Sequence, residues 1–471
     1  MNKRSALIIC LCCIVMSAFL VSCEAAGIKT GDKQPEVVDV KVWTYYTSDQ
    51  LKGFNSLVDE FNSGVGKEKG IHVISYNPGS LSDLVQMVRD SVQGVVGAQE
   101  MPDVFSSYKD MAYELDKLGV VADIAPYMTD DEWDLYVDSY IDDGRFEEGV
   151  IKLFPIAKST EILVINNASF KEFAEECDIS YDDLKTVEGI TRTAEIFYKW
   201  TGGKAFFGRD DIANYFFAGA MELGHELCVT ENGKTSINLD KEVARKLWDN
   251  YYIPFVKGYF SESGKFRTDD IKTGNLVAYV GSSSSANFFP RVVNISDTEQ
   301  ADTEMLALEC PHFEGCEKYA MQQGAGMAVV KNGEEKERAA VEFLKWFTEA
   351  ERNISFSVSA SYLPVQKKAN DMEYIRSVAG SMDDRVEKAF EASLETIKNS
   401  RLYTQDIYEK GFEFRAYLKK AMTDVAREDR GKVVSEMDKG ASYKDALSEF
   451  VSDDYFEDWY ARVCRDIKEF E

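Results

Sequence analysis

The sequence predicts an α/β protein in which strands and helices alternate around a parallel, doubly wound sheet. Two observations support this prediction. From Val38 onward, apolar and polar residues alternate in short stretches, and each stretch is followed by a segment with helical periodicity. The chain has 471 residues, of which 45% are hydrophobic, so it can bury a large core. This length suggests two large lobes or about three domains of ordinary size.

The first part of the chain has the order strand, helix, strand, helix, strand. The predicted strands contain Val38, Val40 and Val42 running into Trp43–Tyr46, then Ile71–Tyr76, then Met101–Tyr108. One helix carries its apolar face over Leu51–Phe61, Ser82 is expected to cap the next, and a third ends at Leu118. Ligands in such sheets bind beyond the carboxyl ends of the strands, which places Thr44–Tyr46 and Ser106–Tyr108 along one crevice.

The pattern restarts after a turn signal at Asp142–Arg145, which is expected to introduce a hairpin into Leu153–Ala157. The later predicted strands are Glu161–Ile165, Leu276–Val280 and Gln322–Val330. The later predicted helices cover Ser169–Glu176, Val187–Phe197, a segment from Asp211, Ala339–Phe347 and most of the chain from Met372.

The N-terminus has the parts of an export signal: Lys3 and Arg4, then an apolar run over Ala6–Val21, then small residues. The run is short for a permanent span, although an uncleaved membrane anchor is the alternative. The segment Leu20–Cys23 resembles the lipobox of bacterial lipoproteins, which implies that Cys23 is acylated and becomes the new N-terminus. We therefore expect a signal peptide at 1–22 and a lipidated linker at 23–36.

The formal net charge of −28 argues against a nucleic-acid partner, because phosphate backbones repel an acidic surface. Cys310, His312 and Cys316 are three candidate metal ligands without a fourth, so we expect no metal and no cofactor. The sequence leaves open whether Cys310 and Cys316 form a disulfide. His225–Glu226 lacks the second histidine of a zinc-protease motif, and the serine run Ser282–Ser285 lacks a nucleophile elbow. The sequence therefore offers no support for catalysis.

Six fragments in a consistent order resemble the extracellular solute-binding lipoproteins of ABC importers, in the sugar-binding family that includes maltose-binding protein. They are VKVWTYY, MPDVFSSYKDMAYELDKLGVVADI, LFPIAKSTEILVINNASF, NLVAYVGSSSSA, QGAGMAVVKNGEEKERAAVEFLKWFTEAERN and SYLPV. The resemblance implies a two-lobed periplasmic-binding-protein-like α/β fold with discontinuous lobes joined by three hinge crossings. These crossings are expected near Lys158–Ser159, Ala320–Gln323 and Leu363–Val365. The N-terminal lobe would comprise 37–158 and 322–363, and the C-terminal lobe 159–321 and 364–471.

The resemblance also implies the ligand-binding residues. They are Thr44, Tyr45, Tyr46, Ser106, Ser107 and Tyr108 after two strands of the first lobe, and Ser159, Thr160, Tyr215, Ser282 and Ser283 in the second. A sugar-stacking tryptophan of the maltodextrin binder is replaced by serines in the Gly-rich turn, and another near Ser107 is absent. Tyr45, Tyr46, Tyr108 and Trp43 could supply aromatic surfaces instead. The alternatives are ordinary core positions for these aromatics and turn formation for the serines.

The expected function is capture of a carbohydrate or related polar solute between the lobes and its delivery to the permease subunits of an ABC transporter. The protein would be a monomer without enzymatic activity, held by Cys23 to the extracytoplasmic face of the bacterial cell membrane. The alternatives are an extracellular glycan-acting enzyme, or a binder of a glycerol phosphodiester or a peptide. A phosphate site would need paired arginines or helix N-termini, and only scattered candidates such as Arg209 and Arg401 are present.

Overall fold

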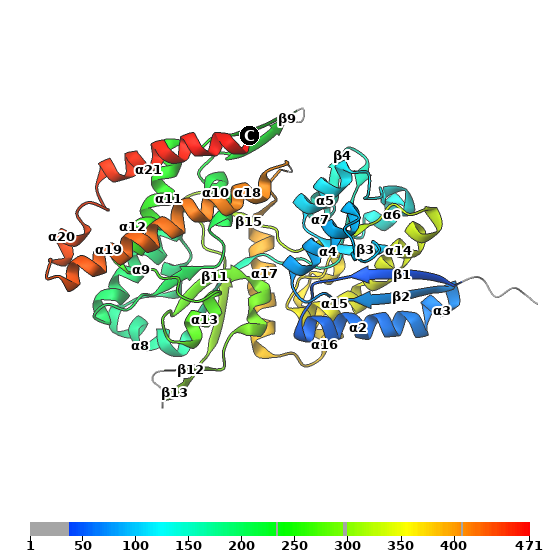
Figure 1. Ribbon diagram of the computed structural model, residues 1–471. Coiled ribbons are helices and arrows are strands. Elements are labelled where there is room, and N and C mark those ends of the chain that lie inside the picture. The colour runs from blue at the N-terminus through cyan, green and yellow to red at the C-terminus, as the bar shows by residue number, and fades with distance from the viewer. Residues whose placement is uncertain (1–36, 232–233, 295–298, 407) are drawn as a thin grey trace, which may run out of the picture.

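The computed structural model describes residues 37–231, 234–294, 299–406 and 408–471. Two α/β lobes lie side by side, each built around its own sheet, with helices on both faces (Figure 1). The predicted signal peptide, the linker and Cys23 lie outside the described residues.

The sheet of the first lobe has five strands in the order β2-β1-β3-β16-β6. Their bounds are β1 Val38–Trp43, β2 Ile71–Tyr76, β3 Val104–Ser107, β6 Leu153–Pro155 and β16 Gly326–Val329. As predicted, β1 is parallel to β2 and to β3. However, β16 runs antiparallel to both β3 and β6, so the sheet is mixed. Because β16 comes from residues far along the chain, the lobe is discontinuous in sequence.

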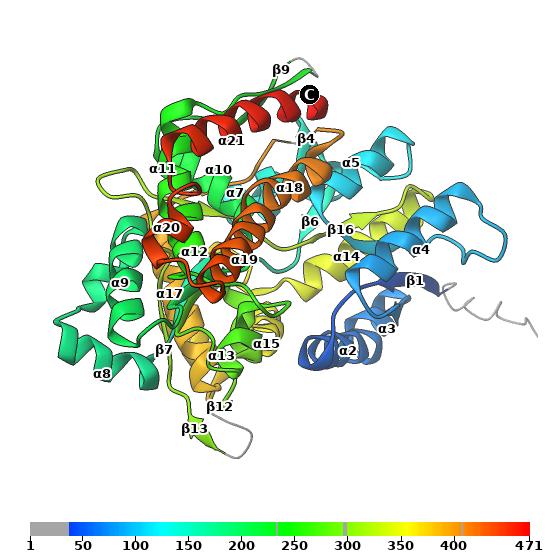
Figure 2. The same cartoon turned by 60° about the vertical axis from the view of Figure 1, so that its left-hand side comes forward.

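Helices cover both faces of this sheet (Figure 2). They are α2 Ser48–Ser63, α3 Val65–Lys69, α4 Leu81–Gln93, α5 Lys109–Lys117, α6 Asp130–Trp133, α7 Asp138–Gly144, α14 Glu334–Phe347 and α15 Ala350–Ala360. One core lies between the sheet and α2, α14 and α15, with Val40, Phe54 and Phe343 fully buried. The other holds Trp43, Leu84 and Phe105 under α4 and α5.

Two local predictions in this lobe are wrong. The N-cap of α4 is Ser80 rather than Ser82, because Asp83 stands at the third helical position and completes a capping box with Ser80. The residues Asp142–Gly144, predicted to be a turn, form the end of α7. The hairpin begins only afterwards, with β4 Arg145–Glu147 and β5 Val150–Ile151.

The second lobe contains a four-stranded sheet in the order β14-β7-β11-β8. The strands are β7 Glu161–Asn166, β8 Phe207–Arg209, β11 Ala278–Ser282 and β14 Met305–Glu309. β7 is antiparallel to β11 and β14, whereas β8 is parallel to β11. The predicted strand at Leu276–Val280 thus begins and ends two residues later, which brings Gly281 and Ser282 into the sheet.

The helices of the second lobe lie in two parts of the chain. They are α8 Asn167–Cys177, α9 Val187–Trp200, α10 Ile212–Glu222, α11 Lys241–Asn250, α12 Tyr252–Lys257, α13 Arg267–Lys272, α17 Asp384–Asn399, α18 Gly411–Lys419, α19 Val425–Asp438, α20 Tyr443–Leu447 and α21 Asp453–Asp466. A π-helical turn at Lys420–Asp424 joins α18 to α19. α16, Met372–Ala379, lies between α15 and α17. Small two-stranded sheets pair β9 Cys228–Glu231 with β10 Lys234–Ile237, β12 Val292–Asn294 with β13 Gln300–Asp302, and β15 Tyr319–Met321 with β17 Arg401–Tyr403.

The chain passes between the two lobes in three segments, which are bonded to one another. Lys158 pairs with Leu363, and Ser159 pairs with Gln323, in both cases as antiparallel bridges. These four residues belong to the three crossings expected from the sequence. Beyond the third crossing, Gln366 still pairs with Tyr136 of the first lobe. The domain boundaries themselves stay a prediction.

Among the described residues, no helix combines the length and the apolar character that crossing a membrane requires.

Candidate ligand-binding cleft

The carboxyl ends of β1 and β3 bring two predicted tyrosines together at the edge of the first sheet. The rings of Tyr45 and Tyr108 are stacked, with centroids 6.4 Å apart and planes 26° from parallel. Tyr108 is 43% exposed, although it is a large aromatic residue. The pair therefore offers an accessible aromatic face at the position where such sheets bind ligands.

The other first-lobe residues that were predicted to bind ligand are buried. Tyr46 packs against Phe54 and Phe356, with ring centroids 5.5 and 5.2 Å away. Thr44 and Ser107 have no exposed surface, and Ser106 is 1% exposed. The Ser107 hydroxyl donates to the carbonyl of Tyr108 at 2.8 Å, which ties down the start of α5. In this conformation, Tyr46 is a core residue, and the three small side chains expose almost no surface to a ligand.

Tyr362, which was not among the predicted site residues, extends the aromatic surface. Its hydroxyl interacts with Tyr45 and Gln50, and burial raises its pKa to about 12. Burial also raises the pKa of Tyr45, and the neighbouring hydroxyls of Tyr362 and Tyr108 raise it further. Both phenols therefore remain protonated at neutral pH. The first lobe thus presents neutral hydroxyls that can donate and accept hydrogen bonds.

Four of the predicted second-lobe residues lie together at the paired ends of β7 and β11. The Ser282 hydroxyl donates to the Ser159 hydroxyl at 3.2 Å, and the backbone NH of Ser283 donates to the carbonyl of Thr160 at 2.8 Å. The Thr160 hydroxyl donates to the carbonyl of Met321 at 3.0 Å. The Ser282 side chain also caps the turn that begins at Ser283. Turn and hinge contacts thus use most of these polar groups.

Tyr215 is buried on α10, and its hydroxyl donates to the carbonyl of Leu247 at 3.1 Å. The guanidinium of Arg209, at the end of β8, lies 4.8 Å from the centre of its ring. This distance is typical of a cation–π contact. The ring of Tyr215 therefore packs against the Arg209 guanidinium, and its hydroxyl is bonded to the backbone of α11.

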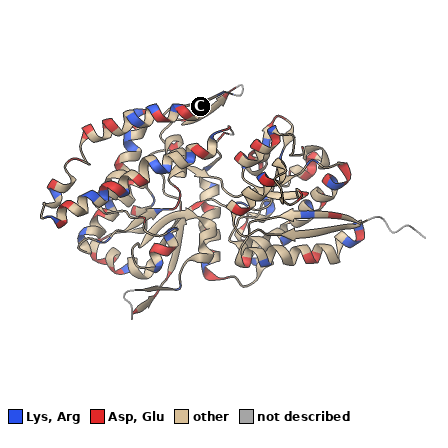
Figure 3. Ribbon diagram, viewed as in Figure 1, with Lys and Arg blue, Asp and Glu red and all other residues tan. Residues whose placement is uncertain are grey.

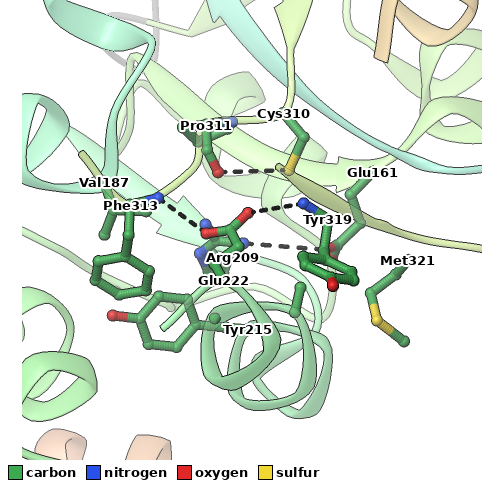
Figure 4. A pocket seen from close by; sticks show the side chains of 12 residues that line it. Glu161, Val187, Arg209, Tyr215, Glu222, Cys310, Pro311, Phe313, Tyr319 and Met321 are labelled. Carbon is green, nitrogen blue, oxygen red and sulfur yellow. Dashed lines mark hydrogen bonds and ion pairs between the residues drawn. The ribbon is translucent and has the colours of Figure 1, made fainter. Parts of the chain in front are cut away.

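A small pocket beneath this edge of the second lobe contains two carboxyl groups and one arginine (Figure 4). It holds about 10 Å³ that a water centre can occupy, which is the scale of one water molecule. Oε2 of Glu161 lies 3.9 Å from Nη1 of Arg209. The Glu222 carboxyl accepts hydrogen bonds from the backbone NH groups of Phe313 and Tyr319. Burial raises the pKa of Glu161 to about 7 and that of Glu222 to about 8, although the positive charge of Arg209 lowers both pKa values in part. Both carboxyl groups therefore hold protons near neutral pH.

Arg415 on α18 is a second cation at this edge, and it was not among the predicted site residues. Its guanidinium donates to Asp211 at 2.7 Å and to Asn214 at 2.6 Å, at the start of α10. From the first lobe, Asp110 on α5 approaches α18 so closely that a Cβ on Gly411 would lie 3.3 Å from the Asp110 Oδ1 atom. Burial raises the pKa of Asp110, and Arg415 partly counters this effect. The two lobes therefore face each other here through polar side chains.

The described part of the chain contains five cysteines, Cys177, Cys228, Cys310, Cys316 and Cys464, and all of them are free thiols. Cys310 and Cys316 therefore do not form the disulfide that the sequence left open. Within the same described ranges, no group of three His, Cys, Asp or Glu side chains is arranged to hold a metal ion.

Comparison with known families decides the class of the protein. The sequence profile of the bacterial extracellular solute-binding proteins matches residues 56–381, which is more than half of the chain. The chain belongs to this family. A sequence search among functionally curated proteins found no match.

Solved structures agree with this solute-binding protein in fold. The cyclic alpha-maltosyl-1,6-maltose binding protein of Arthrobacter globiformis aligns with a TM-score of 0.66 at 16% identity, over 91% of this chain and 100% of that one. The acarbose-binding GacH receptor of Streptomyces glaucescens gives 0.64 at 15% identity, over 91% and 99%. UgpB of Mycobacterium tuberculosis, in complex with glycerophosphocholine, gives 0.65 at 18%, over 92% and 99%. The two-lobed fold of the solute-binding protein is thus shared with these proteins.

Proposed function

We propose that this solute-binding protein captures a carbohydrate, or a related polar solute, between its lobes and delivers it to the permease of an ABC importer. One observation carries the proposal. Tyr108 of the stacked pair Tyr45–Tyr108 is exposed on one lobe, and its hydroxyl lies close enough to Arg415 and Asp211 on the other to feel their charges. Aromatic faces pack on the apolar faces of sugar rings, while hydrogen-bonding groups contact the hydroxyls at the ring edges.

The charge balance of the second-lobe edge favours a neutral ligand. Arg415 is paired with Asp211, and Arg209 lies between Glu161 and the ring of Tyr215. A phosphate at Arg415 would have to displace the Asp211 carboxylate or be repelled by it. A sugar hydroxyl can instead donate to this carboxylate and accept from a guanidinium without breaking the pair.

A glycerol phosphodiester is the second candidate, because UgpB was solved with glycerophosphocholine and two arginines lie at this edge. The pairing of Arg415 with Asp211 makes it the weaker candidate. The described residues offer nothing that favours a peptide ligand. A glycan-acting enzyme is disfavoured because the family consists of binding proteins.

The remaining parts of the proposal concern the whole chain. Export would remove residues 1–22, and acylated Cys23 would hold a monomer at the outer face of the cell membrane. The lobes would rotate about Lys158–Ser159, Ala320–Gln323 and Leu363–Val365. The backbone pairing of these segments supports this assignment.

A thermal-shift screen tests the proposal. Neutral oligosaccharides and glycerophosphodiesters are added separately to the purified chain from residue 24 onward. A ligand at 100 times its Kd adds about 2.7 kcal/mol to the free energy of unfolding, which raises the melting temperature measurably. We expect stabilisation by at least one neutral oligosaccharide. If a glycerophosphodiester stabilises the protein and no sugar does, the second candidate replaces the first.

A further inference from the structure

Lys158 is a buried lysine at the point where the chain first leaves the first lobe. Its side chain is 2% exposed, and its Nζ donates to Oδ2 of Asp143 at 2.5 Å and to the carbonyl of Gly324 at 3.3 Å. Asp143 is itself only 12% exposed. A buried ammonium therefore has its counter-ion on α7 and a second acceptor just beyond the second crossing.

The backbone of Lys158 binds the third crossing. The Lys158 NH donates to the carbonyl of Leu363 at 3.0 Å, and the Leu363 NH donates back at 2.5 Å. The next residue, Ser159, exchanges the same two bonds with Gln323 at 2.9 and 2.8 Å. Lys158 is thus in direct contact with both of the other segments that connect the lobes.

Gly324 fits closely against this lysine. Its φ is +106°, and an added Cβ would lie 2.9 Å from the carbonyl oxygen of Ala157 and 3.2 Å from Cα of Lys158. A side chain would therefore be strained by its backbone angle and would push the crossings apart. Glycine at this position allows the first and second crossings to touch.

Asp143 stands where a carboxylate is otherwise unfavourable. It lies in the last turn of α7, close to the negative end of the helix dipole. The end of α7 is held against β6, because the Lys152 NH donates to the Gly144 carbonyl at 2.8 Å and a Cβ on Gly144 would lie only 2.1 Å from the Leu153 carbonyl oxygen. A buried ion pair adds little net stability compared with apolar side chains, but it can fix one geometry.

We propose that the Lys158–Asp143 pair is a positioning element that holds the three crossings as one unit at the edge of the first lobe. By fixing the base of the hinge, it limits the orientations of the second lobe in the unliganded protein. This inference rests on the lobe rotation in the proposed function, but it does not depend on the identity of the ligand. Loss of the pair lowers the fraction of molecules that can close, and the apparent Kd rises in proportion.

The test measures the distance between the lobes without ligand. Spin labels carried by noncanonical amino acids replace Asp59 on α2 and Glu175 on α8, both of which are exposed. Double electron–electron resonance then compares the wild type with Asp143→Asn and with the double variant Lys158→Met/Asp143→Asn. The control is Asp142→Asn, which alters the neighbouring aspartate on the same helix; Asp142 is 65% exposed and pairs with Arg145.

We expect Asp143→Asn to broaden the distance distribution and to lower the melting temperature, because Lys158 stays buried without its counter-ion. The double variant should regain melting temperature and keep the broad distribution. Asp142→Asn should match the wild type in both measurements. A wild-type distribution in the folded double variant would overturn the proposal and leave the pair a purely structural one. If the two Asp143 variants give broad distributions but the wild type binds no sugar, the inference is sustained and the proposed function is contradicted.

Discussion

Tyr108 is the most exposed of the residues predicted to bind ligand, and its ring stacks on Tyr45. We predict that Tyr108→Ala weakens sugar binding by about 1–3 kcal/mol, the scale of a buried aromatic contact, or roughly fivefold to 150-fold in Kd. Isothermal titration calorimetry with a sugar from the screen measures this loss. The control is Tyr113→Ala. Tyr113 lies on α5, which begins directly after Tyr108, and its ring packs against Phe146, so this variant should leave the Kd unchanged. Equal Kd values for both variants and the wild type would place the site elsewhere.

The buried carboxyl groups beneath the cleft predict a pH dependence of stability. Burial raises the pKa of Glu161 to about 7 and that of Glu222 to about 8, so the folded state holds their protons more tightly than the unfolded state. Their contribution is complete at pH values below the ordinary glutamate pKa and is lost as the pH rises through 7 and 8.

The melting temperature should therefore fall between pH 5 and pH 8.5, as differential scanning calorimetry can measure. Glu161→Gln removes one titrating group, so the melting temperature of this variant should change less over the same range. Glu161 accounts for about 3 kcal/mol of the change in the free energy of unfolding. A wild-type melting temperature that rises over this range would contradict the assignment of these protons.

Single residues also mark the limits of what the sequence could predict. The alternating pattern after Val38 placed Tyr45 and Tyr46 at the end of a strand, but only packing decides which of them is buried. Tyr362 and Arg415 join the cleft from segments hundreds of residues away along the chain. Arg415 lies in a stretch of charged helix where nothing in the local pattern distinguishes it from the other arginines.

The π-helical turn between α18 and α19 is an element whose backbone is bonded by a distant side chain. The indole NH of Trp459 on α21 donates to the carbonyl of Ala421 in this turn at 2.8 Å. Trp459→Phe leaves that buried carbonyl without this donor and should lower the free energy of unfolding by about 1–3 kcal/mol.

Urea denaturation followed by circular dichroism measures this change. Trp200→Phe is the matched control, because its indole NH donates to Glu176 at the protein surface. If both variants unfold at the same urea concentration as the wild type, the Trp459 bond does not stabilise the turn.

Local patterns predicted most elements and misplaced some of their ends. Ile71–Tyr76 is a strand with the predicted bounds, because its alternation matches a half-buried edge strand. Asp142–Gly144 has the composition of a turn, but it forms the end of α7, which is bonded to the segment before β6 through the Lys152 NH and the Gly144 carbonyl. Tertiary contacts of this kind cannot be derived from a local window. The antiparallel pairing of β16 with β3 and β6 also joins residues that are far apart in the sequence.

The acidic and basic side chains are spread over the helices of both lobes (Figure 3). A chain with a net charge of −28 is repelled by anionic lipid headgroups, so attachment to a membrane would depend on the acyl chains at Cys23. We predict that Cys23→Ala moves the protein from the membrane fraction to the soluble fraction, or leaves it unprocessed. Fractionation with immunodetection measures this. A mature variant that remains firmly membrane-bound would contradict the lipid anchor.

In the proposed function, a sugar closes the two lobes around the cleft. A ligand that contacts Tyr45 and Tyr108 on one lobe and the polar groups around Arg415 on the other binds the closed state better than the open one. This difference in affinity is what shifts the equilibrium. Small-angle X-ray scattering with and without saturating sugar tests the claim directly. We predict a smaller radius of gyration with ligand and an unchanged circular dichroism spectrum. A sugar that binds tightly, leaves the radius of gyration unchanged and is insensitive to Tyr108→Ala would contradict it.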